Sequence, residues 1–192
     1  MNRTYHFINK FISTILVSAA IGSCFTVNNP VIPTQNAAAK ATTYRRWDKA
    51  KATVYLQLGK NKDLIAASND AIKAWNKTKA FTFVKTKKPN KAKIVIMPWY
   101  NTTTDFAGYT SWHYKLKNKR MHDATILLNQ FYLQNHSKII LTHEDIVKVV
   151  EHELGHAIGL SHYKKAPSVM DPECKYTIQP LDIKKVKKIY RK

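Results

Sequence analysis

The hydrophobic and polar positions of the chain switch several times between alternating and helical spacing. Short apolar runs that alternate with polar residues, or end at Gly, Pro or basic residues, predict strands. Apolar positions three and four residues apart predict helices. The predicted strands cover residues 52–58, 81–84, 92–97, 106–114 and 124–129, and the predicted helices start near residues 63, 142 and 179. This order of elements predicts an α+β domain with five strands and three helices.

Capping residues and a proline predict where the helices begin. Asp63 is placed to cap a helix that runs to about Lys77. Thr142, with Asp145 three residues later, forms a capping box for the second helix. Pro180 is tolerated in the first turn of the third helix, because the N–H that proline lacks is not needed there. Each helix carries an apolar stripe, so each is expected to bury one face.

Residues 1–39 have the pattern of an export signal. Arg3 and Lys10 give a positive start, and residues 11–27 are mostly apolar. Alanine-rich sites of the A-x-A type predict cleavage near residues 39–41. The apolar run is interrupted and short for a membrane-spanning helix, so an uncleaved anchor is disfavoured.

Cleavage of this leader would leave one domain, residues 40–192, secreted into the medium or associated with the cell wall. The length of 192 residues suits one domain better than two. An alternative remains open at residues 21–24, which resemble a bacterial lipoprotein box. In that case Cys24 would carry lipid and anchor the protein to the membrane.

The composition is strongly basic. The 32 Lys and Arg residues outnumber 12 Asp and Glu residues, for a net charge of +20. The positive electrostatic field of such a protein favours the binding of polyanions, among them an anionic cell-wall polymer such as teichoic acid. The alternative is a solvated basic surface without a dedicated partner, because charge favours association without identifying the partner. No specific nucleic-acid partner is predicted, and a monomer is expected.

One segment has the spacing of metal ligands. Residues 152–162 read His-Glu-x-x-His-x-x-Gly-x-x-His. On a helix, His152 and His156 are four residues apart, so both imidazoles leave the same face. Gly159 permits a left-handed turn after which His162 can return to the same metal. Three imidazoles and one open position predict a catalytic zinc site.

Residues 168–172, Ser-Val-Met-Asp-Pro, follow this motif closely. Because the histidine motif is followed by this methionine-containing segment, the chain resembles the metzincin metallopeptidases. Within them it is most similar to a matrixin (matrix-metalloproteinase-like) catalytic domain of bacterial type. The resemblance implies one catalytic Zn2+ on three histidines, a glutamate as general base and a methionine beneath the metal. The three histidines would be His152, His156 and His162, the general base would be Glu153, and the methionine would be Met170.

The resemblance also implies a fold and a way to bind substrate. The fold is a twisted five-stranded mixed sheet with three helices, in which the strand at 106–114 is the edge above the cleft. A substrate peptide would pair antiparallel with that edge. The segment from residues 173 to 178 would form part of the pocket wall. Candidate residues of the edge and pocket are Ala107, Gly108, Tyr109, Pro172 and Tyr176.

The predicted function is a secreted zinc-dependent endopeptidase. A zinc-bound water molecule, activated by Glu153, would attack the scissile carbonyl, and Glu153 would then deliver the proton to the leaving amine. The alternative is a basic extracellular protein that binds cell-wall polymer or another polyanion and carries a non-catalytic zinc site. The intact Glu153 argues against this alternative, because a structural zinc site does not need that carboxylate.

Some features of animal matrixins are not found in the sequence. No cysteine-bearing propeptide signature and no C-terminal binding domain are recognised. A structural Zn2+ or a Ca2+ site is not supported, because His113, His122 and Asp123 match the pattern poorly and are expected at the surface. Cys174 is either a small apolar residue or a thiol that oxidises or touches zinc.

Overall fold

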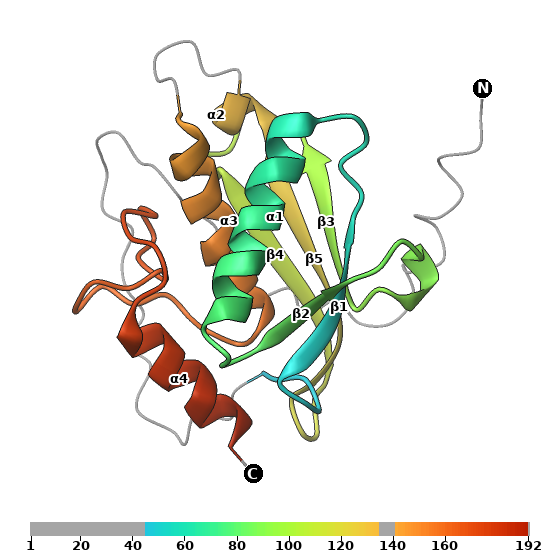
Figure 1. Cartoon of the computed structure of the whole chain (residues 1–192), viewed down its shortest axis with the longest axis vertical. Helices are drawn as coiled ribbons and strands as arrows, with labels where there is room; N and C mark the ends of the chain where they lie inside the picture. The colour runs from blue at the N-terminus through green and yellow to red at the C-terminus, as the bar shows by residue number, and fades with distance from the viewer. Residues whose placement is uncertain (1–44, 135–140, 192) are drawn as a thin grey trace.

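The computed structural model describes residues 45–134 and 141–191 (Figure 1). The predicted leader, with Cys24 and the cleavage region, lies outside the described residues. Along the chain the elements are β1 (Lys51–Leu56), α1 (Lys62–Lys77), β2 (Thr82–Lys85), β3 (Ile94–Trp99), β4 (Gly108–Lys115), β5 (Arg120–Asn129), α2 (Gln130–Gln134), α3 (His143–Ala157) and α4 (Pro180–Tyr190).

The five strands form one mixed sheet in the order β2-β1-β3-β5-β4. The pairs β2–β1, β1–β3 and β3–β5 are parallel, whereas β4 pairs antiparallel with β5. The predicted α+β fold with a five-stranded mixed sheet is therefore confirmed, and the strand that begins at Gly108 lies at the edge. On the side away from β5, the backbone of β4 meets no other described strand, which leaves its N–H and C=O groups available for pairing.

Helices α1 and α3 lie side by side and cover one face of the sheet (Figure 1). Both helices bury an apolar stripe, as the helical spacing predicts. The buried apolar side chains of these stripes are Leu64, Ala67, Ala71, Ile72 and Trp75 in α1 and Ile146, Val149, Val150, Leu154 and Ala157 in α3. Each large side chain removed from water stabilises the fold by about 1.5–3 kcal/mol.

Three buried tryptophans attach the backbone of α3 to its surroundings. Their indole N–H groups each donate to a carbonyl oxygen of α3 at 2.9 Å: Trp75 to Glu151, Trp112 to His156, and Trp47 to Ala157. They come from α1, β4 and the segment before β1. Trp47 and Trp75 are thus core residues. Two of the three acceptors lie in the last helical turn, where carbonyls lack an intrahelical donor.

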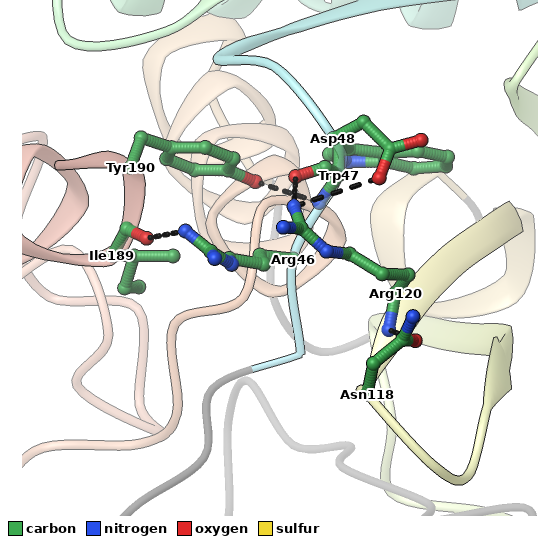
Figure 2. A network of polar contacts seen from close by, with 7 residues as sticks. All are labelled: Arg46, Trp47, Asp48, Asn118, Arg120, Ile189 and Tyr190. Atoms are coloured by element: carbon green, nitrogen blue, oxygen red, sulfur yellow. Dashed lines mark hydrogen bonds and ion pairs between the residues drawn. The ribbon is translucent and has the colours of Figure 1, made fainter. Parts of the chain in front are cut away.

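The segment before β1 contacts β5 and α4 (Figure 2), and through the indole of Trp47 it also contacts α3. Arg46 donates a guanidinium N–H to the carbonyl of Ile189 at 3.1 Å, and Arg120 donates to the carbonyl of Trp47 at 3.2 Å. The hydroxyl of Tyr190 donates to the carbonyl of Ile158, 3.0 Å away at the end of α3. Burial raises the pKa of Tyr190, which keeps this hydroxyl protonated and able to donate. The C-terminal end of α3 is therefore held by residues from both ends of the described chain.

Replacing Gly159 with alanine should destabilise the protein by about 3 kcal/mol, because two penalties combine. Gly159 has φ +101°, which L residues rarely adopt, and a Cβ there would collide with the backbone carbonyl oxygen of Arg45. Urea denaturation measures the loss. Gly59→Ala is a matched control: φ is +60° and a Cβ would meet nothing within 4 Å, so the loss should be about 1 kcal/mol. Equal losses in the two variants would contradict a close approach of Arg45 to Gly159.

Several predicted boundaries need correction. Helix α1 is capped by Asn61, whose side chain accepts from the N–H of Leu64 at 3.1 Å, and Asp63 lies within the first turn. The last strand begins at Arg120 rather than at 124, and the short α2 was not predicted. The capping box of Thr142 and Asp145 is confirmed. Among the helices in the described ranges, none combines the length and the apolar character that crossing a bilayer requires.

Candidate metal centre

The structure brings His152, His156 and His162 together. The first two project from the same face of α3, and the turn at Gly159 returns the chain so that His162 faces them. The candidate ligand atoms of the three residues lie within 4.8 Å of one another. The Nε2 atoms of His152 and His162 are 3.2 Å apart. A tetrahedral zinc with Zn–N bonds of about 2.0–2.1 Å requires a separation of roughly 3.3 Å, so this spacing suits zinc.

Backbone carbonyls orient the two helical imidazoles. His152 Nδ1 lies 2.8 Å from the carbonyl oxygen of Val169, and His156 Nδ1 lies 3.0 Å from that of Leu160. Because a carbonyl oxygen only accepts, each Nδ1 must donate, and each neutral ring then has its lone pair on Nε2. His156 Nε2 is buried and has no hydrogen-bond partner in the described structure. A buried lone pair directed into a cluster of imidazoles fits a metal ion.

The cluster favours neutral imidazoles, the form that binds metal. Burial, followed by the nearby His162, lowers the pKa of His152 to about 3. Burial, followed by the positive charge of Lys164, lowers the pKa of His162 to about 4. Burial also lowers the pKa of His156 well below its ordinary value. At neutral pH a cation therefore does not compete with protons for these nitrogens.

Glu153 lies next to the cluster on α3 and is fully buried. Its Oε2 accepts a hydrogen bond of 2.5 Å from Thr110 of β4, whereas its Oε1 is buried without a hydrogen-bond partner among the described residues. Burial raises the pKa of Glu153 to about 8. A bound cation would lower it again by favouring the carboxylate. Thr110 was not predicted from the sequence, although its position two residues after Gly108 places both on one face of the strand.

Met170 packs against α3, the helix that carries two of the candidate ligands. The side chain is fully buried, and a Cβ added at Gly155 of α3 would lie 2.5 Å from its Sδ. Gly155 therefore provides the space for Met170, consistent with a packing role. The preceding residue, Val169, supplies the carbonyl that orients His152. The turn that contains Met170 thus supports one of the candidate ligands directly.

A buried carboxylate on α4 holds this turn in place. Asp182 accepts hydrogen bonds from the hydroxyl of Ser168 at 2.5 Å, from the N–H of Val169 at 2.8 Å and from the N–H of Gln179 at 2.9 Å. The side chain of Asp182 is fully buried. A chain of contacts therefore runs from α4 through the turn to His152. The sequence indicates Asp182 only as a polar residue in the first turn of a helix.

Replacing Asp182 with asparagine should destabilise the protein by about 3 kcal/mol, because it leaves buried donors without a charged acceptor. Zinc affinity should fall as well, since the carbonyl that orients His152 is then less firmly held. Chemical denaturation and a zinc titration measure the two effects. Asp48→Asn is the control: its side chain is 84% exposed in an ion pair with Arg120, so stability should change by less than about 0.5 kcal/mol. If Asp182→Asn were as harmless as the control, Asp182 would not anchor the turn.

The candidate edge residues differ in how they face the free edge of β4. The carbonyl of Ala107 accepts from the N–H of Asn129 at 2.9 Å, and its side chain is buried. In an antiparallel ladder, alternate residues direct their backbone groups to the same side. Ala107 and Tyr109 therefore face β5, whereas Gly108 and Thr110 direct their N–H and C=O groups to the free edge.

The candidate pocket residues lie on the segment that follows Met170. Pro172 is buried, and Tyr176 is 36% exposed at the surface. The hydroxyl of the next residue, Thr177, donates to Oε2 of Glu151 at 2.5 Å. Because Glu151 directly precedes the first candidate ligand on α3, this bond fixes the segment beside the metal centre. Cys174 on the same segment is buried, with φ +50°.

His113, His122 and Asp123 lie apart from the metal centre, in the β4–β5 ladder. Both histidines contact the same carboxylate, through Nδ1 at 2.6 and 2.8 Å, and both are largely exposed. They occupy the surface positions predicted for them.

The α+β fold, a donor set suited to zinc and an adjoining carboxylate suited to proton transfer together define a zinc metallopeptidase. The chain belongs to the matrixin family, whose sequence profile matches residues 40–191. The family consists of zinc-dependent endopeptidases that use catalytic zinc, and such enzymes act on protein or peptide substrates. None of the curated proteins compared with the chain matches it significantly.

Proposed function

We propose that the protein is a secreted endopeptidase in which His152, His156 and His162 hold one catalytic zinc and Glu153 is the general base. The observation that carries this proposal is the convergence of three neutral imidazoles, two of them oriented through Nδ1, beside a buried carboxylate. Bound zinc supplies a Lewis acid that polarises the scissile carbonyl and lowers the pKa of water.

Glu153 would transfer the proton. Its carboxylate takes a proton from the attacking water and returns it to the leaving amine. The unpartnered Oε1 is the oxygen available for this exchange, since Oε2 is occupied by the hydroxyl of Thr110. Burial of the carboxylate excludes bulk water that would otherwise compete as proton donor and acceptor.

The substrate would bind as an extended strand antiparallel to β4. The free backbone groups of Gly108 and Thr110 supply hydrogen bonds that do not depend on side-chain identity. The segment with Pro172 and Tyr176, fixed to α3 through Thr177, would form one wall of the side-chain pocket. A strand edge pairs with an extended internal segment of a substrate, which favours cleavage within a chain over removal of terminal residues.

We also propose that residues 1–39 direct export, that residues 40–192 form the catalytic domain, and that this domain acts as a monomer outside the cell or at its wall. The net charge of +20 would hold it near an anionic cell-wall polymer. Screening by salt should weaken that association.

Removing and restoring the metal tests the proposed activity. The purified protein should cleave an unfolded protein substrate, lose this activity in excess chelator, and regain it when zinc is added back. Cleavage that persists without metal would contradict the proposal. Zinc binding without cleavage of any tested substrate would instead favour the non-catalytic polyanion-binding protein, for which salt-sensitive binding to teichoic acid is the next assay.

A further inference from the structure

Two inward-facing residues of β4 contact the carboxylate of Glu153. The hydroxyl of Thr110 donates to Oε2 at 2.5 Å and also lies 3.2 Å from the backbone carbonyl oxygen of Glu153. Thr110 is fully buried. Gly108, two residues earlier, lies so close that a Cβ would be 2.5 Å from Oε1 and 2.7 Å from Cγ. The carboxylate thus lies against the strand, in contact with both positions.

The two contacts have different effects on the carboxylate. A hydrogen bond to Oε2 fixes the rotation of the carboxylate, because the donor is itself held in a β-strand. The absence of a side chain at Gly108 leaves space for Oε1, which has no hydrogen-bond partner in the described part of the chain. The two contacts therefore distinguish the carboxylate oxygens of Glu153. Oε2 is held by the hydrogen bond from Thr110, whereas Oε1 remains available for proton exchange.

We propose that Thr110 is a positioning residue for the general base and that Gly108 provides the space the base requires. This inference rests on the proposed role of Glu153 in proton transfer. Thr110 does not touch the reacting atoms; it acts by holding Oε2 so that Oε1 faces the site of proton exchange.

The same two residues direct their backbone groups to the free edge of β4, where the proposed substrate strand pairs. These two residues therefore contribute to the proposed site in two ways. On their inward face they contact the carboxylate of Glu153, and along the free edge their backbone groups would pair with the substrate peptide. A shift of β4 by a fraction of an ångström would therefore displace both the substrate and the base. Proton transfer depends steeply on such distances, so the turnover number should respond more strongly than substrate binding.

The test compares Thr110→Val with Thr110→Ser. Valine keeps the branched shape and removes the hydroxyl, whereas serine keeps the hydroxyl. Thr53→Val is the control, because Thr53 of β1 also loses a side-chain hydrogen bond, to the carbonyl of Lys91 at 2.6 Å, but contacts no residue of the metal centre through it. For each protein, the bound zinc per chain, kcat and KM are measured on one peptide substrate.

Thr110→Val should retain one zinc per chain and a KM within about threefold of the wild type, while kcat falls about ten- to hundredfold, as expected when a buried charged group loses one hydrogen bond. Thr110→Ser should recover kcat to within a few-fold, and Thr53→Val should match the wild type. Gly108→Ala should also lower kcat with zinc retained, because its Cβ displaces the carboxylate. If Thr110→Val does not fold, Thr110→Ala against Thr110→Ser provides the same comparison.

The proposal is overturned if zinc-loaded Thr110→Val turns over like the wild type, or if Thr110→Ser is as impaired as Thr110→Val, since packing rather than the hydroxyl would then matter. These outcomes are separable from failure of the proposed function. If the wild type cleaves and depends on Glu153, only the role of Thr110 is in question. If the zinc-loaded wild type does not cleave, the proposed function fails first and the positioning role fails with it.

Discussion

A Glu153→Ala protein should bind one zinc ion per chain and hydrolyse peptide bonds about a hundred- to ten-thousandfold more slowly than the wild type. Zinc is retained because the carboxylate is not needed as a ligand: three imidazoles converge without it. Turnover is lost because the variant lacks the buried carboxylate beside the cluster, which is the proposed proton acceptor. The change appears in kcat, measured with zinc-saturated protein.

Glu144→Ala is the matched control. Glu144 follows His143 on the same helix, where the chain repeats the first two letters of the metal motif, but it is exposed in the first turn. The Glu144→Ala protein should have an unchanged kcat. Its stability should fall only by the favourable interaction of the carboxylate with the helix dipole, about 0.3–1 kcal/mol. A zinc-loaded Glu153→Ala protein that cleaves within a few-fold of the wild-type rate would exclude Glu153 as general base.

The second large effect concerns the metal itself. His156→Ala should remove zinc binding at micromolar zinc and, with it, all measurable cleavage. His156 Nε2 is the buried, unpartnered nitrogen of the cluster, and its Nδ1 is committed to the carbonyl of Leu160. Without it, two imidazoles remain, too few for the three-ligand site of a catalytic zinc.

Thermal unfolding with and without zinc measures this loss independently of activity. Zinc should stabilise the wild type by about 2.7 kcal/mol at a hundredfold excess over its dissociation constant, because it binds the folded state. The His156→Ala protein should show no such rise in melting temperature. His143→Ala is the control, since His143 is exposed and pairs with Asp70 at 2.9 Å, and zinc should stabilise it like the wild type. Equal zinc stabilisation of His156→Ala and the wild type would exclude His156 as a ligand.

The parts of this site that are predictable from sequence depend on local spacing. The relation between His152 and His156 follows from the helical repeat, and the return of His162 follows from a glycine with positive φ. The capping box of Thr142 also lies within one turn. Such features need no knowledge of the rest of the chain, so the order of strands and helices and the placement of His152 and His156 on one helix are predicted correctly.

The parts that the sequence did not reveal depend on contacts between distant segments. The hydrogen bond of Thr110 to Glu153 spans 43 positions, and that of Trp47 to Ala157 spans 110. Both depend on the register of β4 and on the packing of α3, which no local pattern encodes. The start of α1 was misplaced for a different reason: Asn61 and Asp63 are both good caps, and only the backbone conformation distinguishes them.

Stoichiometric activation by zinc tests the central claim most directly. Metal-free protein at a fixed concentration well above the dissociation constant is titrated with zinc while the cleavage of an unfolded protein substrate is followed. We expect the rate to rise linearly from zero and to level off at one zinc per chain. A rate that does not respond to zinc, or that levels off well away from one equivalent, would contradict a single catalytic zinc held by His152, His156 and His162.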